Sequence, residues 1–221
     1  MLFPYKDDHP FKAVPAVTLL IIAVNSYVFL HLLLFAQGGR EAFLAYGAIP
    51  DALLHHRTGQ PVPPLATVFL SLFMHSGFLH LAVNMGYLWI FSHKIEEDLG
   101  HLRFLFFYLF CGACAVYIYA ATAPHSLRPL VGASGAVSGI IGAYISLYPQ
   151  AKVHSLLFLG FYKRTIRIPA FLIIGAWASW QFYGGIISLF LIKNSNTAWF
   201  AHLGGFLIGL SSIRLWLPGK R

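Results

Sequence analysis

Four polar residues, carried by three separate apolar stretches, have the side chains that acyl transfer requires. Ser134 lies in the tetrapeptide Gly-Ala-Ser-Gly, and His202 lies near the start of another apolar stretch. His80 and Asn84 are four residues apart, so in a helix they share one face. A serine hydroxyl attacks a carbonyl when a nearby imidazole accepts its proton, and N–H donors stabilise the resulting oxyanion. The set contains the groups of a serine hydrolase, provided that the fold brings the three segments together.

The composition indicates which elements must position these residues. The chain has 221 residues, of which 58% are hydrophobic and 10% are charged. Soluble domains carry about 25% charged residues, so this chain lacks the polar surface needed in water. Its length accommodates about six membrane-spanning helices of roughly 20 residues each. We predict an all-α membrane protein with six transmembrane helices at 13–36, 78–95, 102–121, 134–149, 169–191 and 198–216.

The two segments before the second helix need separate treatment. The first apolar run is too long for a signal-peptide core and lacks a small-residue cleavage site, so we predict a retained helix. The connection 37–77 contains four prolines but also many large apolar side chains. Such a segment is predicted to lie in the membrane interface as a loop between helices 1 and 2.

Basic residues predict the orientation of the helices. If both termini are cytoplasmic, eleven lysines and arginines lie inside and only Arg40, Arg57, Arg128 and Lys193 lie outside. Cytoplasmic connections carry the excess of basic residues, so this orientation is favoured, and the net charge of +8 does not indicate a nucleic-acid partner. The orientation places the four polar residues at a similar depth, reached from the extracytoplasmic side.

The distribution of carboxylates argues against several other functions. The seven acidic residues lie in the N-terminal tail, in connections or at a helix end, and none follows Asp98. An aspartyl protease of the membrane needs two buried aspartates, and a zinc protease of the HExxH type needs a motif that is missing. A proton- or sodium-coupled transporter usually needs an intramembrane carboxylate. Cys111 and Cys114 have no partner cluster, so we interpret them as packing residues, and the sequence implies no metal or organic cofactor.

Small residues favour close contact between the fourth and sixth predicted helices. Gly135 and Gly139 lie on one face of the fourth helix, and Gly205 and Gly209 share the face of His202. Small faces allow membrane helices to approach closely, which a serine–histidine hydrogen bond requires. Taken alone, each motif has a simpler explanation, because an intramembrane serine often bonds its own helix and paired glycines often serve packing. Their combination at one depth favours a catalytic site.

Together these segments resemble the rhomboid family of intramembrane serine proteases. The matching segments are His80-Leu-Ala-Val-Asn84-Met85, Gly132-Ala-Ser134-Gly135 and Ala198-x-x-x-His202-x-x-Gly205-x-x-x-Gly209. Glu96 followed by Gly100 and the N-terminal run from Pro4 to Pro10 are also similar to family members. The resemblance covers nearly the whole chain. It implies a six-helix rhomboid-like bundle, a catalytic Ser134–His202 dyad, His80 and Asn84 in the oxyanion site, and transmembrane protein substrates.

The sequence departs from the family pattern in two places. Many members carry Tyr or Phe four residues after the nucleophile, packed on the catalytic histidine, whereas this chain has Ser138. The connection 37–77 also lacks a Trp-Arg pair that some members carry. With no acidic residue beyond Asp98, we expect His202 to be held by packing across Gly205 and Gly209 and by a hydroxyl or backbone carbonyl on its second nitrogen.

These observations lead to one predicted organisation and two alternatives. We predict a cytoplasmic tail at 1–12, a six-helix rhomboid protease domain at 13–216 and a cytoplasmic tail at 217–221. The predicted location is the bacterial inner membrane, with the lipid bilayer and transmembrane substrates as partners. The main alternative is a non-catalytic rhomboid-like protein that binds membrane proteins, and the other is a small-solute channel or transporter. The presence of both Ser134 and His202 favours a serine endopeptidase over either alternative.

Overall fold

The computed structural model describes residues 2–10, 13–35, 39–56, 59–159, 162–190 and 198–219. Within these ranges, each of the six segments predicted to span the membrane is helical. Lys12, Arg57, Lys193, Lys220 and Arg221, which contributed to the predicted orientation, lie outside the described residues. The long helices are α1 (Ala16–Phe35), α5 (Phe78–Leu99), α6 (His101–Thr122), α7 (Ser134–Leu147), α8 (Ala170–Phe190) and α9 (Trp199–Trp216).

The helices differ in their capacity to cross a membrane. In the described part of the chain, α1, α6 and α8 are each long and apolar enough to do so. A fourth span results if α5 and the two short helices before it, α4 (Pro64–Leu70) and η1 (Ser71–Phe73), count as one span bent by 84°. α7 has 14 residues and is about 21 Å long, shorter than the roughly 30 Å hydrocarbon core of a bilayer. The chain is an integral membrane protein. That it crosses the membrane six times stays a prediction.

The connection between α1 and α5 is largely helical. It contains α2 (Arg40–Tyr46) and α3 (Pro50–His55) as well as α4 and η1. Val68 and Leu72 are buried and belong to one apolar cluster with Val116 of α6. Other apolar side chains of the connection, including Leu65 and Phe69, are exposed. An element with one apolar side packed on the bundle and another left open suits the predicted position in the membrane interface.

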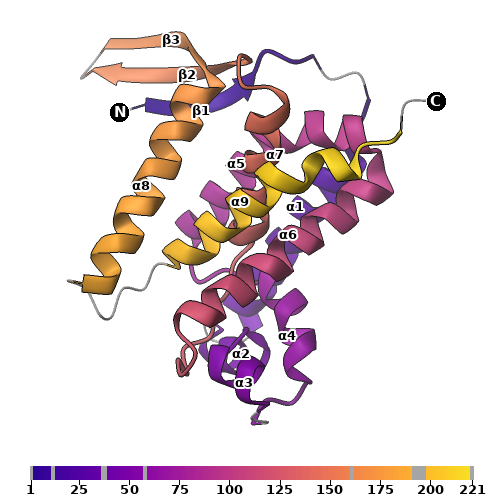
Figure 1. The fold of residues 1–221 in the computed structure, drawn as a ribbon, viewed down its shortest axis with the longest axis vertical. Helices are drawn as coiled ribbons and strands as arrows, with labels where there is room; N and C mark the ends of the chain where they lie inside the picture. Colours follow the sequence, from indigo (N-terminus) through magenta and orange to yellow (C-terminus); the bar gives the residue numbers. More distant parts are fainter. Residues whose placement is uncertain are drawn as a thin grey trace.

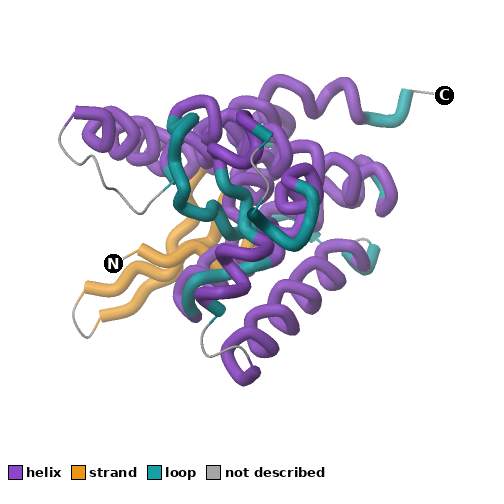
Figure 2. Tube along the Cα trace, turned by 90° about the horizontal axis from the view of Figure 1, so that it is seen from below, coloured by secondary structure: helices purple, strands orange, loops and turns teal. Residues whose placement is uncertain are grey.

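The opposite end of the molecule carries a small antiparallel sheet that the sequence analysis did not predict. Its order is β1 (Leu2–Asp7), β2 (Lys152–Leu159), β3 (Tyr162–Pro169). Figure 2 shows the three strands side by side, and Figure 1 places the sheet and the last turn of α9 towards one end of the molecule and α2 and α3 at the other. The predicted cytoplasmic tail at 1–12 thus contains a strand, because the backbone of β1 bonds that of β2, with Leu2 opposite Leu157; its cytoplasmic location stays a prediction.

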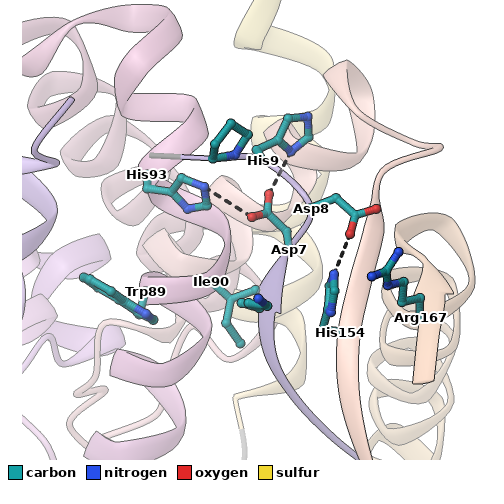
Figure 3. Close-up of a pocket in the computed structure, with 10 residues that line it drawn as sticks. Asp7, Asp8, His9, Trp89, Ile90, His93, His154 and Arg167 are labelled. Atoms are coloured by element: carbon teal, nitrogen blue, oxygen red, sulfur yellow. Dashed lines mark hydrogen bonds and ion pairs between the residues drawn. The ribbon is translucent and has the colours of Figure 1, made fainter. Parts of the chain in front are cut away.

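Buried carboxylates fasten the N-terminal segment and α1 to α5. Glu96 of α5 is 1% exposed and accepts hydrogen bonds from the backbone N–H groups of Val17 and Thr18 at the start of α1. Asp7 at the end of β1 lies against α5 and α7, where Tyr144 donates to it at 2.6 Å and His93 lies 3.2 Å away (Figure 3). These two carboxylates are thus part of the interior, although both lie where the sequence suggested connections or helix ends.

Candidate active site

The first residue of α7 and the first turn of α9 bring a hydroxyl and an imidazole into hydrogen-bond contact. Ser134 Oγ lies 2.9 Å from His202 Nε2, although the two residues are 68 positions apart in the chain. Ser134 follows Gly132, whose φ of +128° is a conformation that L side chains rarely adopt. A Cβ on Gly132 would lie 2.8 Å from Cε1 of His80. Glycine at this position therefore permits both the turn into α7 and the approach of His80.

The contact between α7 and α9 depends on glycines on both helices. A Cβ on Gly205 would overlap the carbonyl oxygen of Gly135, and a Cβ on Gly209 would overlap that of Gly139. A Cβ on Gly139 would also overlap the Cβ of Cys111, which is buried on α6. The structure therefore places the four predicted packing glycines at the α7–α9 contact. Close backbone approach of this kind is what small residues allow between membrane helices.

The second nitrogen of His202 has a partner that the sequence analysis missed. Gln181 of α8 is 7% exposed, and its Oε1 lies 2.8 Å from His202 Nδ1. An amide oxygen can only accept, so in this arrangement Nδ1 carries the hydrogen and Nε2 is left to accept the proton of Ser134. The expectation of a hydroxyl or backbone carbonyl at this nitrogen was wrong, since the acceptor is a side-chain amide.

His80 and Asn84 lie beside the serine–histidine pair. Both line the same hollow as Ser134 and His202, a space of about 170 Å³. Asn84 is 5% exposed, and among the described residues its Nδ2 has no hydrogen-bond acceptor. A buried N–H group without a partner destabilises a fold, so such a group at a hollow is available to a ligand. The structure thus brings together all four residues that the sequence singled out for acyl transfer.

Two neighbouring residues complete the surroundings of the pair. Ser138, which replaces the aromatic residue of many relatives, donates its hydroxyl hydrogen to the carbonyl oxygen of Ser134 at 2.6 Å. It therefore bonds its own helix and leaves the bracing of His202 to Gln181. His75, which the sequence analysis did not single out, is 2% exposed, and its ring lies 5.0 Å from that of His80. Both of its ring nitrogens lack a hydrogen-bond partner within the described parts of the chain.

A second and larger hollow also has Ser134 in its lining. It has a volume of about 540 Å³ and shares His80, Ser134 and His202 with the smaller one. The other lining residues include Phe43 of α2, Tyr119 of α6, and part of the loop that precedes α7, with Arg128 among its residues. Within the described residues, neither hollow has an aspartate or glutamate in its lining. Among the described lining residues, the imidazoles of His80 and His202 are therefore the groups suited to accept the proton of Ser134.

Comparison with known proteins identifies the family. Residues 64–218 match the model of the rhomboid domain, which is most of the chain. Presenilin-associated rhomboid-like protein A, mitochondrial, of Danio rerio is 31% identical over 147 residues, covering 64% of this chain and 35% of the relative. The human presenilin-associated rhomboid-like protein, mitochondrial, is 27% identical over 172 residues, covering 74% of this chain and 41% of the relative. Rhomboid protein 1, mitochondrial, of Saccharomyces cerevisiae is 30% identical over 151 residues, covering 63% of this chain and 38% of the relative.

The extent of the match defines what the likeness covers. The chain spans about two fifths of the length of the curated relatives that it matches. The matched family model, in contrast, begins at α4 and ends after α9, so it includes Ser134, His202, Gln181, His80 and Asn84, whereas Phe43 of α2 lies before it. The chain belongs to the rhomboid family.

Proposed function

We propose that this protein is an intramembrane serine endopeptidase that cleaves transmembrane protein substrates through a Ser134–His202 dyad. The observation that carries the proposal is the 2.9 Å contact between Ser134 Oγ and His202 Nε2, with Gln181 on the other imidazole nitrogen. A nucleophile, a base and a group that orients the base are the minimum set for activating a serine. Membership of the rhomboid family supports the same assignment.

The proposed reaction begins with proton transfer from the serine. His202 Nε2 accepts the proton of Ser134 as Oγ attacks a peptide carbonyl, and the bond from Nδ1 to Gln181 keeps the imidazole in the required tautomer. His202 then gives this proton to the leaving amine. A water molecule, activated by the same imidazole, hydrolyses the acyl-enzyme and restores the serine.

The oxyanion of the tetrahedral intermediate needs preorganised donors. We assign this role to the side chains of His80 and Asn84 together with the backbone N–H of Ser134. Support comes from the buried Asn84 Nδ2, which has no acceptor among the described residues, and from the position of His80 against Gly132. Donors held in place before the reaction stabilise the transition state without reorganisation.

The shape of the site suggests the form of the substrate. A peptide in a transmembrane helix has its carbonyl oxygens bonded within the helix, so the scissile segment must be extended or readily unwound. The hollow of about 540 Å³ beside Ser134 is bounded by α2 and by the loop before α7, at the end of the molecule that carries the interfacial helices. Glycine or proline near the cleavage site would favour the unwound form.

The predicted topology and location belong to the same proposal. We propose six crossings with both termini on the cytoplasmic side. The bias in basic residues supports this orientation, and so does the position of β1 and the last turn of α9 at the same end of the molecule (Figure 1). The proposed bacterial inner membrane has no support from the relatives described, whose names place them in mitochondria. Reporter fusions after Arg128 and after Arg164 test the orientation, since the first should be extracytoplasmic and the second cytoplasmic.

The alternative is a non-catalytic rhomboid-like protein that binds other membrane proteins. Cleavage of a model transmembrane substrate by the purified protein in detergent distinguishes the two. Ser134→Ala should abolish cleavage while the protein still inserts and unfolds at the same temperature. Ser211→Ala is the matched control, because that exposed hydroxyl bonds only the backbone of its own helix at 2.7 Å. A fluorophosphonate should add mass at Ser134, and labelling of a different serine would refute the assignment.

A further inference from the structure

A second cluster of ligand-type side chains lies apart from Ser134, where α3 meets the loop after α6. We propose that Asp51, His55 and His125 form a binding site for a divalent metal ion of the Zn²⁺ class. Their potential ligand atoms, one carboxylate oxygen and one ring nitrogen from each histidine, all lie within 4.8 Å of one another. The site does not depend on the proposed proteolysis, and the sequence analysis implied no metal here.

The geometry of the cluster matches a tetrahedral ion. Oδ1 of Asp51 lies 3.1 Å from Nδ1 of His55 and 4.0 Å from Nδ1 of His125. Ligands about 2.0–2.1 Å from a tetrahedral zinc ion are separated from each other by about 3.3 Å. The two distances lie on either side of that value, so adjustment of the exposed His125 would close the ligand set around an ion.

The rings are arranged for shared coordination. The imidazoles of His55 and His125 are stacked with centroids 5.0 Å apart and planes inclined by 3°. In each ring, Nδ1 lies within 4.0 Å of the same carboxylate oxygen, Oδ1 of Asp51. At 4.0 Å the contact of His125 is too long for a hydrogen bond, so hydrogen bonding to Asp51 explains the position of only one of the two rings.

The ligand types select the class of ion. Two imidazole nitrogens and one carboxylate oxygen suit Zn²⁺ and similar transition metals, whereas Mg²⁺ and Ca²⁺ prefer oxygen ligands alone. The side chain of Asp51 is 4% exposed, while those of His55 and His125 are 36% and 81% exposed. A buried charge with two accessible imidazoles gives the ion a path from solvent and leaves a fourth position for water.

The bound ion would join two segments that already touch and that lead to the active site. The backbone N–H of Asp51 donates to the carbonyl oxygen of Ser126 at 3.2 Å. Ala48 and Leu130 exchange two backbone hydrogen bonds of 3.1 and 2.8 Å. Leu130 lines the larger hollow beside Ser134. An ion at Asp51 would therefore tie α3 to the loop that forms one wall of that hollow.

The test measures metal binding and needs no protease activity. The protein, purified in detergent and stripped with a chelator, is titrated with Zn²⁺ by calorimetry at pH 7. We expect one Zn²⁺ ion per protein molecule to bind more tightly than any further Zn²⁺ ions. His125→Gln should weaken that binding by about 10–100-fold or more, as expected for loss of a metal-binding group. Because His125 is exposed, this variant should fold, and its unfolding temperature without metal provides the check.

Matched variants decide whether the ion lies where we place it. His55→Gln should lower the affinity as His125→Gln does. His56→Asn is the control, since His56 is an exposed neighbour with φ of +52°, a conformation that asparagine tolerates. Zn²⁺ should raise the unfolding temperature of the wild type and of His56→Asn but not of His125→Gln. The proposal is wrong if His125→Gln binds Zn²⁺ with wild-type affinity, or if His56→Asn loses as much affinity as His125→Gln. It is also wrong if tight Zn²⁺ binding is lost only in His202→Asn.

Discussion

Helices α5 and α7 lie beside buried polar side chains at both of their ends, but the two ends carry different kinds of polar group. On α5, His80 and His93 are separated by about 20 Å along the helix, and on α7, Ser134 and Tyr144 are separated by about 15 Å. At the Ser134 end, the groups are a hydroxyl, imidazoles and amides. At the other end, a buried carboxylate, that of Asp7, is at the centre of the cluster (Figure 3).

The two clusters differ in the group at their centre and in what surrounds it. Asp7 lies within bonding distance of Tyr144, His93 and His9. Burial alone raises the pKa of Asp7, but hydrogen bonds from His93, Tyr144 and His9 outweigh burial, so its pKa lies below the ordinary value. At the Ser134 end, Asn84 Nδ2 and both nitrogens of His75 have no partner among the described residues. The carboxylate of Asp7 is surrounded by groups that hold it in place, whereas the donors without an acceptor at the Ser134 end are available to a ligand.

The largest effect should come from breaking the Ser134–His202 pair. We expect His202→Asn to lower kcat by about 10⁴-fold or more, since a serine without its base is a poor nucleophile. Residues that act as a unit are strongly non-additive, so adding Ser134→Ala to His202→Asn should cause little further loss. Cleavage of a model transmembrane substrate by the two single variants and the double variant measures this. Losses that multiply in the double variant would mean that the two residues act separately.

Removing a donor at the same end should have the next largest effect. His80→Ala should lower kcat by about 10²–10³-fold, the usual result of losing one oxyanion donor. Asn84→Ala should have a smaller effect, because the backbone donor and water substitute in part. The measurement is kcat at saturating substrate, with unfolding temperature as the control for structure. Wild-type kcat in both variants and in the double variant would make these residues structural, like those around Asp7.

Gln181 should matter less, because it acts on the substrate only through His202. Leaving the buried Nδ1–H of His202 without an acceptor costs about 1–3 kcal/mol, so Gln181→Leu should lower kcat by about ten- to a hundred-fold. KM should stay nearly constant, and labelling of Ser134 by a fluorophosphonate should slow in proportion to kcat. Gln181→Glu, which keeps an acceptor oxygen, should recover part of the loss.

A control on the same helix separates positioning from general packing of α8. Ser188→Ala removes a hydroxyl that bonds only the carbonyl oxygen of Gly185, at 2.7 Å. It should leave both kcat and the labelling rate within a few-fold of wild type. Equal losses in Ser188→Ala and Gln181→Leu would mean that α8 acts as a whole and that Gln181 has no special role.

The site residues could be found from the sequence because polar side chains stand out in apolar helices. Ser134, His202, His80 and Asn84 were selected in this way, and their helices were placed within a few residues. Gln181 is the only side-chain amide in 169–191 and was nevertheless overlooked. A signal existed, because the buried residues of α8, namely Ala170, Ile174, Gln181 and Gly185, follow one helical stripe. The sequence alone could not show that this stripe faces His202.

The sheet and the buried carboxylates were harder to predict. The pairing of β1 with β2 joins residues about 150 positions apart, and the register of such a contact is not written in either segment alone. Asp7 and Glu96 lie in segments that look like a tail and a helix end, yet they are 5% and 1% exposed. Their burial depends on partners such as Tyr144 and Thr18, which are distant in the chain. Local patterns predicted the helices, while these contacts arise only when the helices assemble.

The smallest effect on catalysis, and the clearest on stability, should come from Asp7→Asn. The substitution keeps the shape of the side chain but removes the charge that Tyr144, His93 and His9 surround, so we expect a loss of about 1–3 kcal/mol in the free energy of unfolding at pH 7. The pKa of Asp7 is depressed in the folded protein, so its contribution is present above the unfolded value near 3.8 and is lost as the pH falls further. The gap in unfolding temperature between wild type and Asp7→Asn should thus be wide at pH 7 and narrow below about pH 4.

Asp8→Asn is the control, because the Asp8 side chain is 37% exposed and should contribute less. kcat of Asp7→Asn should stay within a few-fold of wild type at a temperature where both are folded, since Asp7 lies at the far end of α5 and α7 from Ser134. A loss of kcat comparable to that of His80→Ala would show that the two ends are coupled and that their division into an anchoring and a reactive cluster is incorrect.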